Sequence, residues 1–256
     1  DVGLTPVAAL GFAYHTTEAR IGTQNGTLSV TGAMNVTAEH SGLVDSDATG
    51  ATQGNDLAIG ASLGLSYVKE SVTATTARSL SSGGAMTFNA KSSSVHTTDA
   101  IASASGAKKD TKEADGSGDT GQSVQGQVDD QRAVGNNQSS SNTSGGKTSG
   151  TDNKATATTA DSKNDQDSDG DGVSVAAAVA VSIVETNANA EIGDGLTITS
   201  GGLLTVRASQ NADAAAKAMG TAVTEGSAGI AAAVAINVID VGNHAKIGNS
   251  TITADG

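Results

Sequence analysis

The sequence predicts an all-β protein, a right-handed parallel β-helix (β-solenoid) with one long disordered or loop insertion. Three observations predict this fold: a unit of roughly 53 residues that recurs, apolar runs that alternate with a period of two, and a composition almost free of bulky side chains. With 33 Gly, one Pro, no Trp and 2% aromatic residues, a compact core for 256 residues would be hard to fill. A solenoid needs only a narrow core that neighbouring repeats share.

The repeating unit opens on a run of small apolar residues and closes on a strand with the pattern G-[AL]-[ML]-x-[VF]-x-A. Met86 follows Met34 by 52 residues, but Leu204 follows Met86 by 118. The excess indicates an insertion of about 65 residues in the second unit. The opening runs begin at Pro6, Ala58, Val173 and Ala228, and the closing strands begin at Gly32, Gly84 and Gly202.

These spacings divide the chain into three parts: repeats one and two over 1–105, a polar low-complexity insertion over 106–172, and repeats three and four over 173–256. The fourth unit stops midway at Gly256, and the first begins without an initiator Met. We therefore expect a fragment of a longer chain.

The opening runs predict strands rather than helices. In the third unit Val175, Val179 and Val181 fall on one face, and small residues such as Ala176 and Ala178 fall on the other. Ala favours helices, but in the first two units Gly and Ser replace it and no 3.6-residue stripe can be drawn. The larger residues are expected to face inward, including Phe12, Tyr14 and Tyr67 in the first two units.

The second face of each run contains Gly, Ala and Ser instead of the longer polar residues of a solvated surface. It is expected either to pack against another layer or another molecule, or to keep a slender solenoid flat. Most of the remaining unit also alternates, with brief turns such as 193–195 and 201–202. A unit of this size predicts roughly two rungs of the helix.

The insertion is too polar to fold by itself. From Gly106 to Gly172 it has no Leu, Ile, Phe, Tyr, Trp or Met, so it buries too little apolar surface to offset its ordering entropy. We expect a long flexible excursion from one rung, which serves as a presented binding loop or is a tolerated surface insertion.

The motif DQDSDGDG at the end of the insertion predicts a calcium site. Asp165, Asp167, Asp169 and Asp171 supply hard oxygen ligands at alternate positions, and the glycines permit a turn. The bidentate Glu of an EF-hand loop is missing, because the twelfth position is Ala. The alternative is a solvated acidic linker.

Composition excludes several classes of protein. The net charge of −13 argues against nucleic acid as a partner, because phosphate binding needs clustered Lys and Arg. The absence of Cys excludes disulfides and thiolate metal sites. The longest apolar stretch, 173–184, is about half the length of a membrane span, so no transmembrane segment is expected.

No catalytic motif is present, and we expect no enzyme. The four histidines, His15, His40, His96 and His244, stand singly in polar stretches and are expected to be exposed. The sequence contains neither GxSxG nor a Walker A motif. The acids that lie near strand ends resemble ordinary turn residues; they are Glu18, Glu185, Glu191 and Asp240.

The stretches GVSVAAAVAVSIVE and GIAAAVAINVID, each followed by I-G-[DN], are the most distinctive repeats, and the pattern G-x-L-T-V-x-A closes a unit. They resemble the repeats of giant secreted adhesins of Gram-negative bacteria, of the filamentous-haemagglutinin and leukotoxin-like kind. The resemblance covers about three quarters of the chain, excludes the insertion, and specifies architecture better than function. It implies an exported, surface-associated parallel β-helix.

We expect a structural or adhesive stalk segment of a large secreted, extracellular or cell-surface bacterial protein, which mediates attachment or the assembly of a fibre or matrix. Its expected partners are neighbouring repeats or copies of itself, through the Gly/Ala/Ser face, and host or cell-surface glycans or proteins. Two alternatives remain, a β-helix polysaccharide-processing enzyme and a calcium-dependent surface-binding module.

Overall fold

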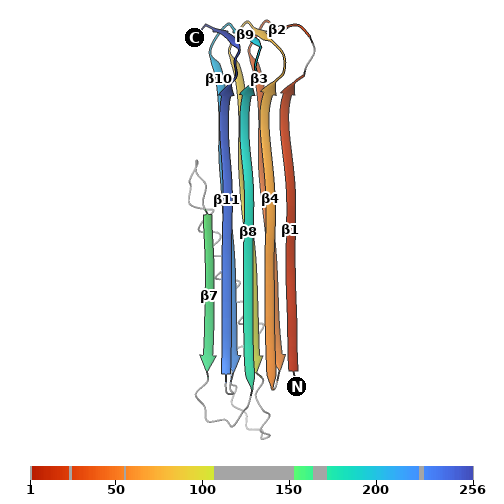
Figure 1. The fold of residues 1–256 in the computed structure, drawn as a ribbon, viewed down its shortest axis with the longest axis vertical. Helices are drawn as coiled ribbons and strands as arrows, with labels where there is room; N and C mark the ends of the chain where they lie inside the picture. Colours follow the sequence, from red (N-terminus) through yellow and green to blue (C-terminus); the bar gives the residue numbers. More distant parts are fainter. Residues whose placement is uncertain are drawn as a thin grey trace, which may run out of the picture.

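The computed structural model describes residues 2–22, 25–54, 56–106, 153–163, 172–224 and 228–255. All regular secondary structure in these ranges is β-strand, and all of the strand pairs are parallel. The strands form an elongated parallel β-solenoid, as the sequence predicts (Figure 1).

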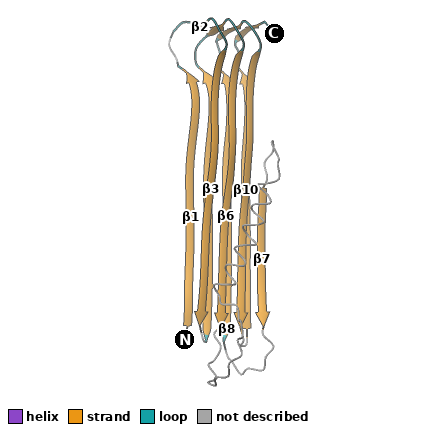
Figure 2. Cartoon of the chain, turned by 180° about the vertical axis from the view of Figure 1, so that it is seen from behind, coloured by secondary structure: helices purple, strands orange, loops and turns teal. Residues whose placement is uncertain are grey.

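The solenoid has three sheets, which we name by their place in the figures. The front sheet of Figure 1 contains β1 (Val2–Ile21), β4 (Leu57–Thr76), β8 (Val173–Ile192) and β11 (Ala228–Ile247). The back sheet, which faces the viewer in Figure 2, contains β3 (Met34–Gly54), β6 (Met86–Gly106), β10 (Leu204–Thr224) and β7 (Asn153–Lys163). The end sheet contains β2 (Leu28–Val30), β5 (Leu80–Ser82), β9 (Thr197–Ser200) and β12 (Thr251–Ala254).

Each repeat unit forms one coil of the solenoid, so the expectation of two rungs per unit is wrong. Val2 lies opposite Leu57 in the front sheet, and Met34 lies opposite Met86 in the back sheet. Two strands of 20 and 21 residues, far longer than the usual five or six, therefore use up the whole unit. The chain ascends the front sheet, crosses the end sheet and descends the back sheet as it advances from β1 to β11, which is the right-handed sense (Figure 1).

The insertion leaves the stack without separating the coils, because β4 pairs directly with β8. Most of 106–172 lies outside the described residues, but Asn153–Lys163 form β7, which extends the back sheet beside β10. No strand was expected there, because the segment lacks large apolar residues. Backbone hydrogen bonding to the edge of β10 provides the partners that side-chain burial would not.

The two faces of the front sheet are the reverse of the prediction. In β8, Ala176, Ala178 and Ala180 are at most 1% exposed, whereas Val179 and Val181 face outward. The same alternation holds in β1, β4 and β11, although the side chains of the two outer strands are less deeply buried. The prediction that the large residues face inward is wrong, and the Gly/Ala/Ser face is the interior of the solenoid.

The aromatic residues of the first two units lie on the surface as well. Phe12 is 60% exposed and Tyr14 is 68% exposed, and Tyr67 is half-buried on the next strand. The rings of Tyr14 and Tyr67 are in tilted contact, with centroids 5.7 Å apart and an angle of 52° between their planes. Their expected place in the core is therefore also wrong.

The reason is the close approach of the front and back sheets. A Cβ atom on Gly64 would lie 2.8 Å from the carbonyl oxygen of Asp99, and one on Gly60 would collide with the carbonyl oxygen of Ser103. Larger side chains at these positions would force the sheets apart. Ser62 uses the short distance to donate a hydrogen bond across the gap to the carbonyl oxygen of Ile101, at 2.5 Å.

The largest apolar residues fill the interior near the end sheet. Phe88, Met86, Leu80, Ile192 and Ile198 are fully buried there. At the opposite end the buried cluster consists of alanines alone. The interior therefore changes along the strands from a wide apolar core to a narrow one made of small residues.

The burial pattern makes a direct prediction from two adjacent alanines of β8. Ala178→Val adds two methyl groups inside the narrow core and should cost about 1–3 kcal/mol of the free energy of unfolding. Ala177→Val adds the same groups to the outer face and should change it by less than about 0.5 kcal/mol. Chemical denaturation of the two variants measures the difference, and a larger loss for Ala177→Val would show that the assignment of the faces is reversed.

Candidate functional site

The predicted calcium ligands cannot be placed. Asp165, Asp167, Asp169 and Asp171 lie outside the described residues, and the description resumes at Gly172, just before β8. Calcium binding at this motif stays a prediction.

The acids of the enzymatic alternative lie on the outer face of the front sheet. Glu185 accepts a hydrogen bond from the Nζ of Lys69 at 3.0 Å, and this contact lowers the pKa of Glu185. Asp240 is its neighbour on β11 in the strand register. Glu191 pairs with Lys246 at 3.6 Å, and Glu18 is exposed on β1. None of these carboxylates is buried, so their surroundings are those of ordinary surface acids.

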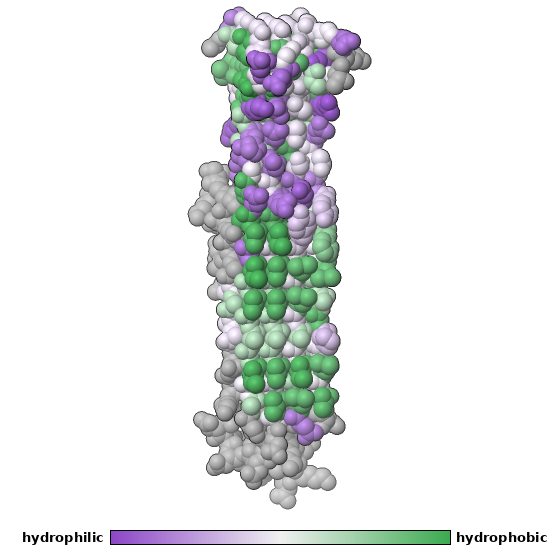
Figure 3. All heavy atoms as spheres, viewed as in Figure 1, coloured by the Kyte–Doolittle hydropathy of each residue, from purple (hydrophilic) through white to green (hydrophobic). Residues whose placement is uncertain are grey.

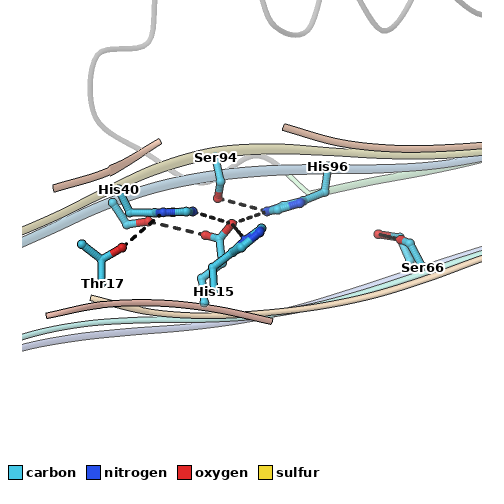
Figure 4. Close-up of polar contacts among 9 residues, drawn as sticks. His15, Thr17, His40, Ser66, Ser94 and His96 are labelled. Atoms are coloured by element: carbon cyan, nitrogen blue, oxygen red, sulfur yellow. Dashed lines mark hydrogen bonds and ion pairs between the residues drawn. The ribbon is translucent and has the colours of Figure 1, made fainter. Parts of the chain in front are cut away.

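Three of the four histidines are not exposed turn residues, contrary to the prediction. His15, His40 and His96 converge on the carboxylate of Glu70 inside the solenoid (Figure 4). Only His244 is exposed on the outer face, at the far end of the stack. We call the four converging residues the His/Glu cluster.

The cluster has a compact geometry around one oxygen. Oε1 of Glu70 lies 3.4 Å from Nε2 of His40, 3.6 Å from Nε2 of His96 and 3.8 Å from Nδ1 of His15. None of these three contacts has the geometry of a hydrogen bond. Ser92 donates a weak hydrogen bond to Oε2 of Glu70 at 3.5 Å.

Burial makes this arrangement electrostatically demanding. The side chains of Glu70 and His96 are fully buried, and those of His40 and His15 are 14% and 41% exposed. Desolvation lowers the pKa of His96, and the nearby Glu70 opposes the shift. A buried carboxylate costs free energy unless a positive charge or several donors compensate it.

The coil register explains how the cluster forms. His15 of β1 and Glu70 of β4 are opposite each other in the front sheet, while His40 and His96 come from β3 and β6 of the back sheet. These side chains occupy the inward positions of their strands. The sequence contains a signal for the cluster, because Glu70 has the same parity as the small residues of its run, but the hydrophobic pattern predicts that this face lies outside.

Other polar residues extend the cluster into a belt between the two kinds of core. The hydroxyls of Ser66 and Thr98 bond across the sheets at 2.6 Å. Thr186, the neighbour of Glu70 on β8, is 3% exposed, and its hydroxyl has no hydrogen-bond partner among the described residues.

Two matched substitutions test how this belt contributes to stability. Thr186→Val replaces an unpaired buried hydroxyl by a methyl group and should leave the free energy of unfolding unchanged or raise it by about 1 kcal/mol. Ser66→Ala leaves the Thr98 hydroxyl without its cross-sheet partner and should lower it by about 1–3 kcal/mol. Denaturant titrations measure both values, and equal losses would contradict the assigned pairing.

A second feature is an unusually large apolar surface on the front sheet, which appears as a green field in Figure 3. Outward side chains form six rows of four along the coil axis, and none of them is charged. Leu10 is 60% exposed and Ile230 is 54% exposed. We call this surface the apolar array; its rows are Val2/Leu57/Val173/Ala228, Leu4/Ile59/Val175/Ile230, Pro6/Ala61/Ala177/Ala232, Ala8/Leu63/Val179/Val234, Leu10/Leu65/Val181/Ile236 and Phe12/Tyr67/Ile183/Val238.

The array ends sharply at the row formed by Tyr14, Lys69, Glu185 and Asp240. Beyond it the outward residues of the same strands are mainly polar, as the purple half of the face in Figure 3 shows. The front sheet therefore presents two halves with opposite character.

No protein-family model, curated protein or solved structure matches this chain. Among the described residues there is also no helix with the length and apolar character to cross a bilayer.

Proposed function

We propose that this chain is a structural segment of a large secreted or cell-surface bacterial protein, a rigid solenoid that assembles laterally through the apolar array. The apolar array is the main observation that supports this proposal. The repeat motifs that resemble those of giant adhesins support it, as does the continuous parallel ladder of all four coils.

The size of the array fits a stable interface. Four strands about 4.8 Å apart and 11 residues long at about 3.3 Å each span roughly 19 by 36 Å, or about 700 Å². The largest apolar patch of an ordinary monomer is about 300–600 Å². Two such faces packed together would bury about 1,400 Å², which lies within the range of specific protein–protein interfaces.

The occupant that fits this surface best is a second copy of the chain. Flat sheets with regular rows pack face to face about 10 Å apart, and a two-fold interface uses the same patch on both partners. An antiparallel arrangement pairs the two apolar halves and leaves the polar halves in water. A parallel one would bring the carboxylates of Glu185 and Asp240 against their own copies, which is unfavourable.

One pair of substitutions on β4 tests this assembly. Leu63→Lys places a charge within the array, and Thr73→Lys places the same charge on the outward polar half of the same strand. Burial of a Leu contributes about 1.5–3 kcal/mol and occurs twice in a two-fold dimer, so Leu63→Lys should weaken association at least ~100-fold. Thr73→Lys should have little effect.

Sedimentation of each protein over a range of concentrations gives the dimer dissociation constant. The folded state should be unaffected in both variants, because both side chains point outward, and circular dichroism checks this. A wild-type chain that stays monomeric, or equal weakening by both substitutions, would rule out self-association through the array. Binding of the monomer to phosphatidylcholine vesicles would instead indicate that the array docks on a lipid surface.

A further inference from the structure

We propose that His15, His40 and Glu70 bind a divalent transition-metal ion, for which zinc is the best match, inside the first two coils. This site is independent of the assembly through the apolar array. It explains the buried His/Glu cluster, for which a scaffold has no evident need.

The donor atoms already have the spacing of a metal site. The candidate ligand atoms of His15, His40 and Glu70 all lie within 4.8 Å of one another. In a tetrahedral zinc site with bonds of about 2.0–2.1 Å, neighbouring ligand atoms are about 3.3–3.4 Å apart. The distances from Oε1 of Glu70 to the nitrogens of His40 and His15 are 3.4 and 3.8 Å, so small rotations would complete the geometry.

The unpaired atoms are those that a metal would use. Nδ1 of His15, Nε2 of His40 and Oε1 of Glu70 are buried and have no hydrogen-bond partner among the described residues. The Glu70 side chain is fully buried, so its bare oxygen cannot turn to solvent for compensation. A divalent cation between the three atoms would compensate the carboxylate and all of the unpaired lone pairs at once.

The surroundings of the ligands support the assignment. Nδ1 of His40, the ring nitrogen away from Glu70, lies 3.5 Å from the hydroxyl of Thr17, and such outer contacts fix the orientation of a metal-binding imidazole. His15 is half-exposed at the edge of the front sheet and gives an ion a path from solvent. A zinc held by three protein ligands keeps a fourth position for solvent, while Nε2 of His96 pairs with the hydroxyl of Ser94 at 3.0 Å.

The donor set also selects the class of ion. Two imidazoles with one carboxylate suit zinc and its neighbours in the first transition series. Calcium and magnesium prefer ligand sets made of oxygen, and this cluster supplies only one carboxylate. The site therefore differs in chemistry from the acidic motif of the insertion.

Such an ion would join three strands that are far apart in the sequence. His15 belongs to β1, His40 to β3 and Glu70 to β4, so the metal would tie the front sheet to the back sheet and the first coil to the second. Both β1 and β3 are edge strands at the start of the stack. Metal binding should thus stabilise the coil that has a neighbour on only one side.

The test uses the whole chain, without an affinity tag and freed of metal with a chelator. Calorimetric titration with zinc chloride should give about one ion per chain. At a hundredfold excess of free zinc over the dissociation constant, the unfolding temperature should rise by about 5–10 °C. The cobalt(II) complex should show the visible absorption of a tetrahedral ion with nitrogen ligands.

His15→Asn and His244→Asn form a matched pair, because the first removes a ligand and the second changes the exposed histidine at the far end. His15→Asn and Glu70→Gln should weaken zinc binding by at least ~100-fold, more than the loss of a second-sphere contact causes. His244→Asn should bind as the wild type does. If Glu70→Gln does not fold, the result for His15→Asn tests the proposal alone, because the half-exposed His15 side chain can be replaced without disturbing the core.

The proposal is overturned if the wild-type chain binds no zinc, or if His15→Asn binds it as tightly as the wild type. Retention of the tetrahedral cobalt spectrum in His15→Asn would overturn it equally. Calcium titrations of the same proteins provide a further control, since any binding by the acidic motif should be the same in His15→Asn and the wild type.

Discussion

The close approach of the front and back sheets determines which side chains this solenoid can bury. At Gly60 the backbone of the front sheet lies so near the carbonyl oxygen of Ser103 that no Cβ atom fits between them, and Gly220 is in the same position against Ala232. Small residues, mostly Gly, Ala, Ser and Thr, therefore occupy the inward positions over half the length of the strands. The larger residues of each run are left on the outer face, because strand geometry sends alternate side chains to opposite sides.

This constraint also explains why the interior changes along the strands. Near the end sheet a third side opens the coil, and residues as large as Phe88 are buried. The His/Glu cluster and the cross-sheet pair of Ser66 and Thr98 lie between that core and the alanine core. The facing sheet supplies a hydrogen-bond partner to some of these polar groups, as Thr98 does to Ser66. Oε1 of Glu70 and the hydroxyl of Thr186 have no such partner among the described residues.

Much of the fold could be predicted from the sequence, because repeats and alternation report directly on strands and register. The spacing of 52 residues between Met34 and Met86 is the register of the back sheet. What could not be predicted is which face is inside, since hydrophobicity alone sends Val179 inward and the sheet separation is a property of two strands, not one. The cluster is hard to predict for the same reason: Glu70 and His15 are 55 residues apart and lie on the face that hydrophobicity places outside.

A solenoid built in this way depends less on the burial of large side chains than a globular domain does. Its coils are held by continuous backbone ladders and by tightly packed small residues, and a large continuous apolar surface of the front sheet remains in contact with water. A globular protein gains free energy when it covers such a surface during folding. In this solenoid the surface stays uncovered after folding, so the same gain remains available for association. Association through the array would use that free energy between molecules, which is the property that a scaffold requires.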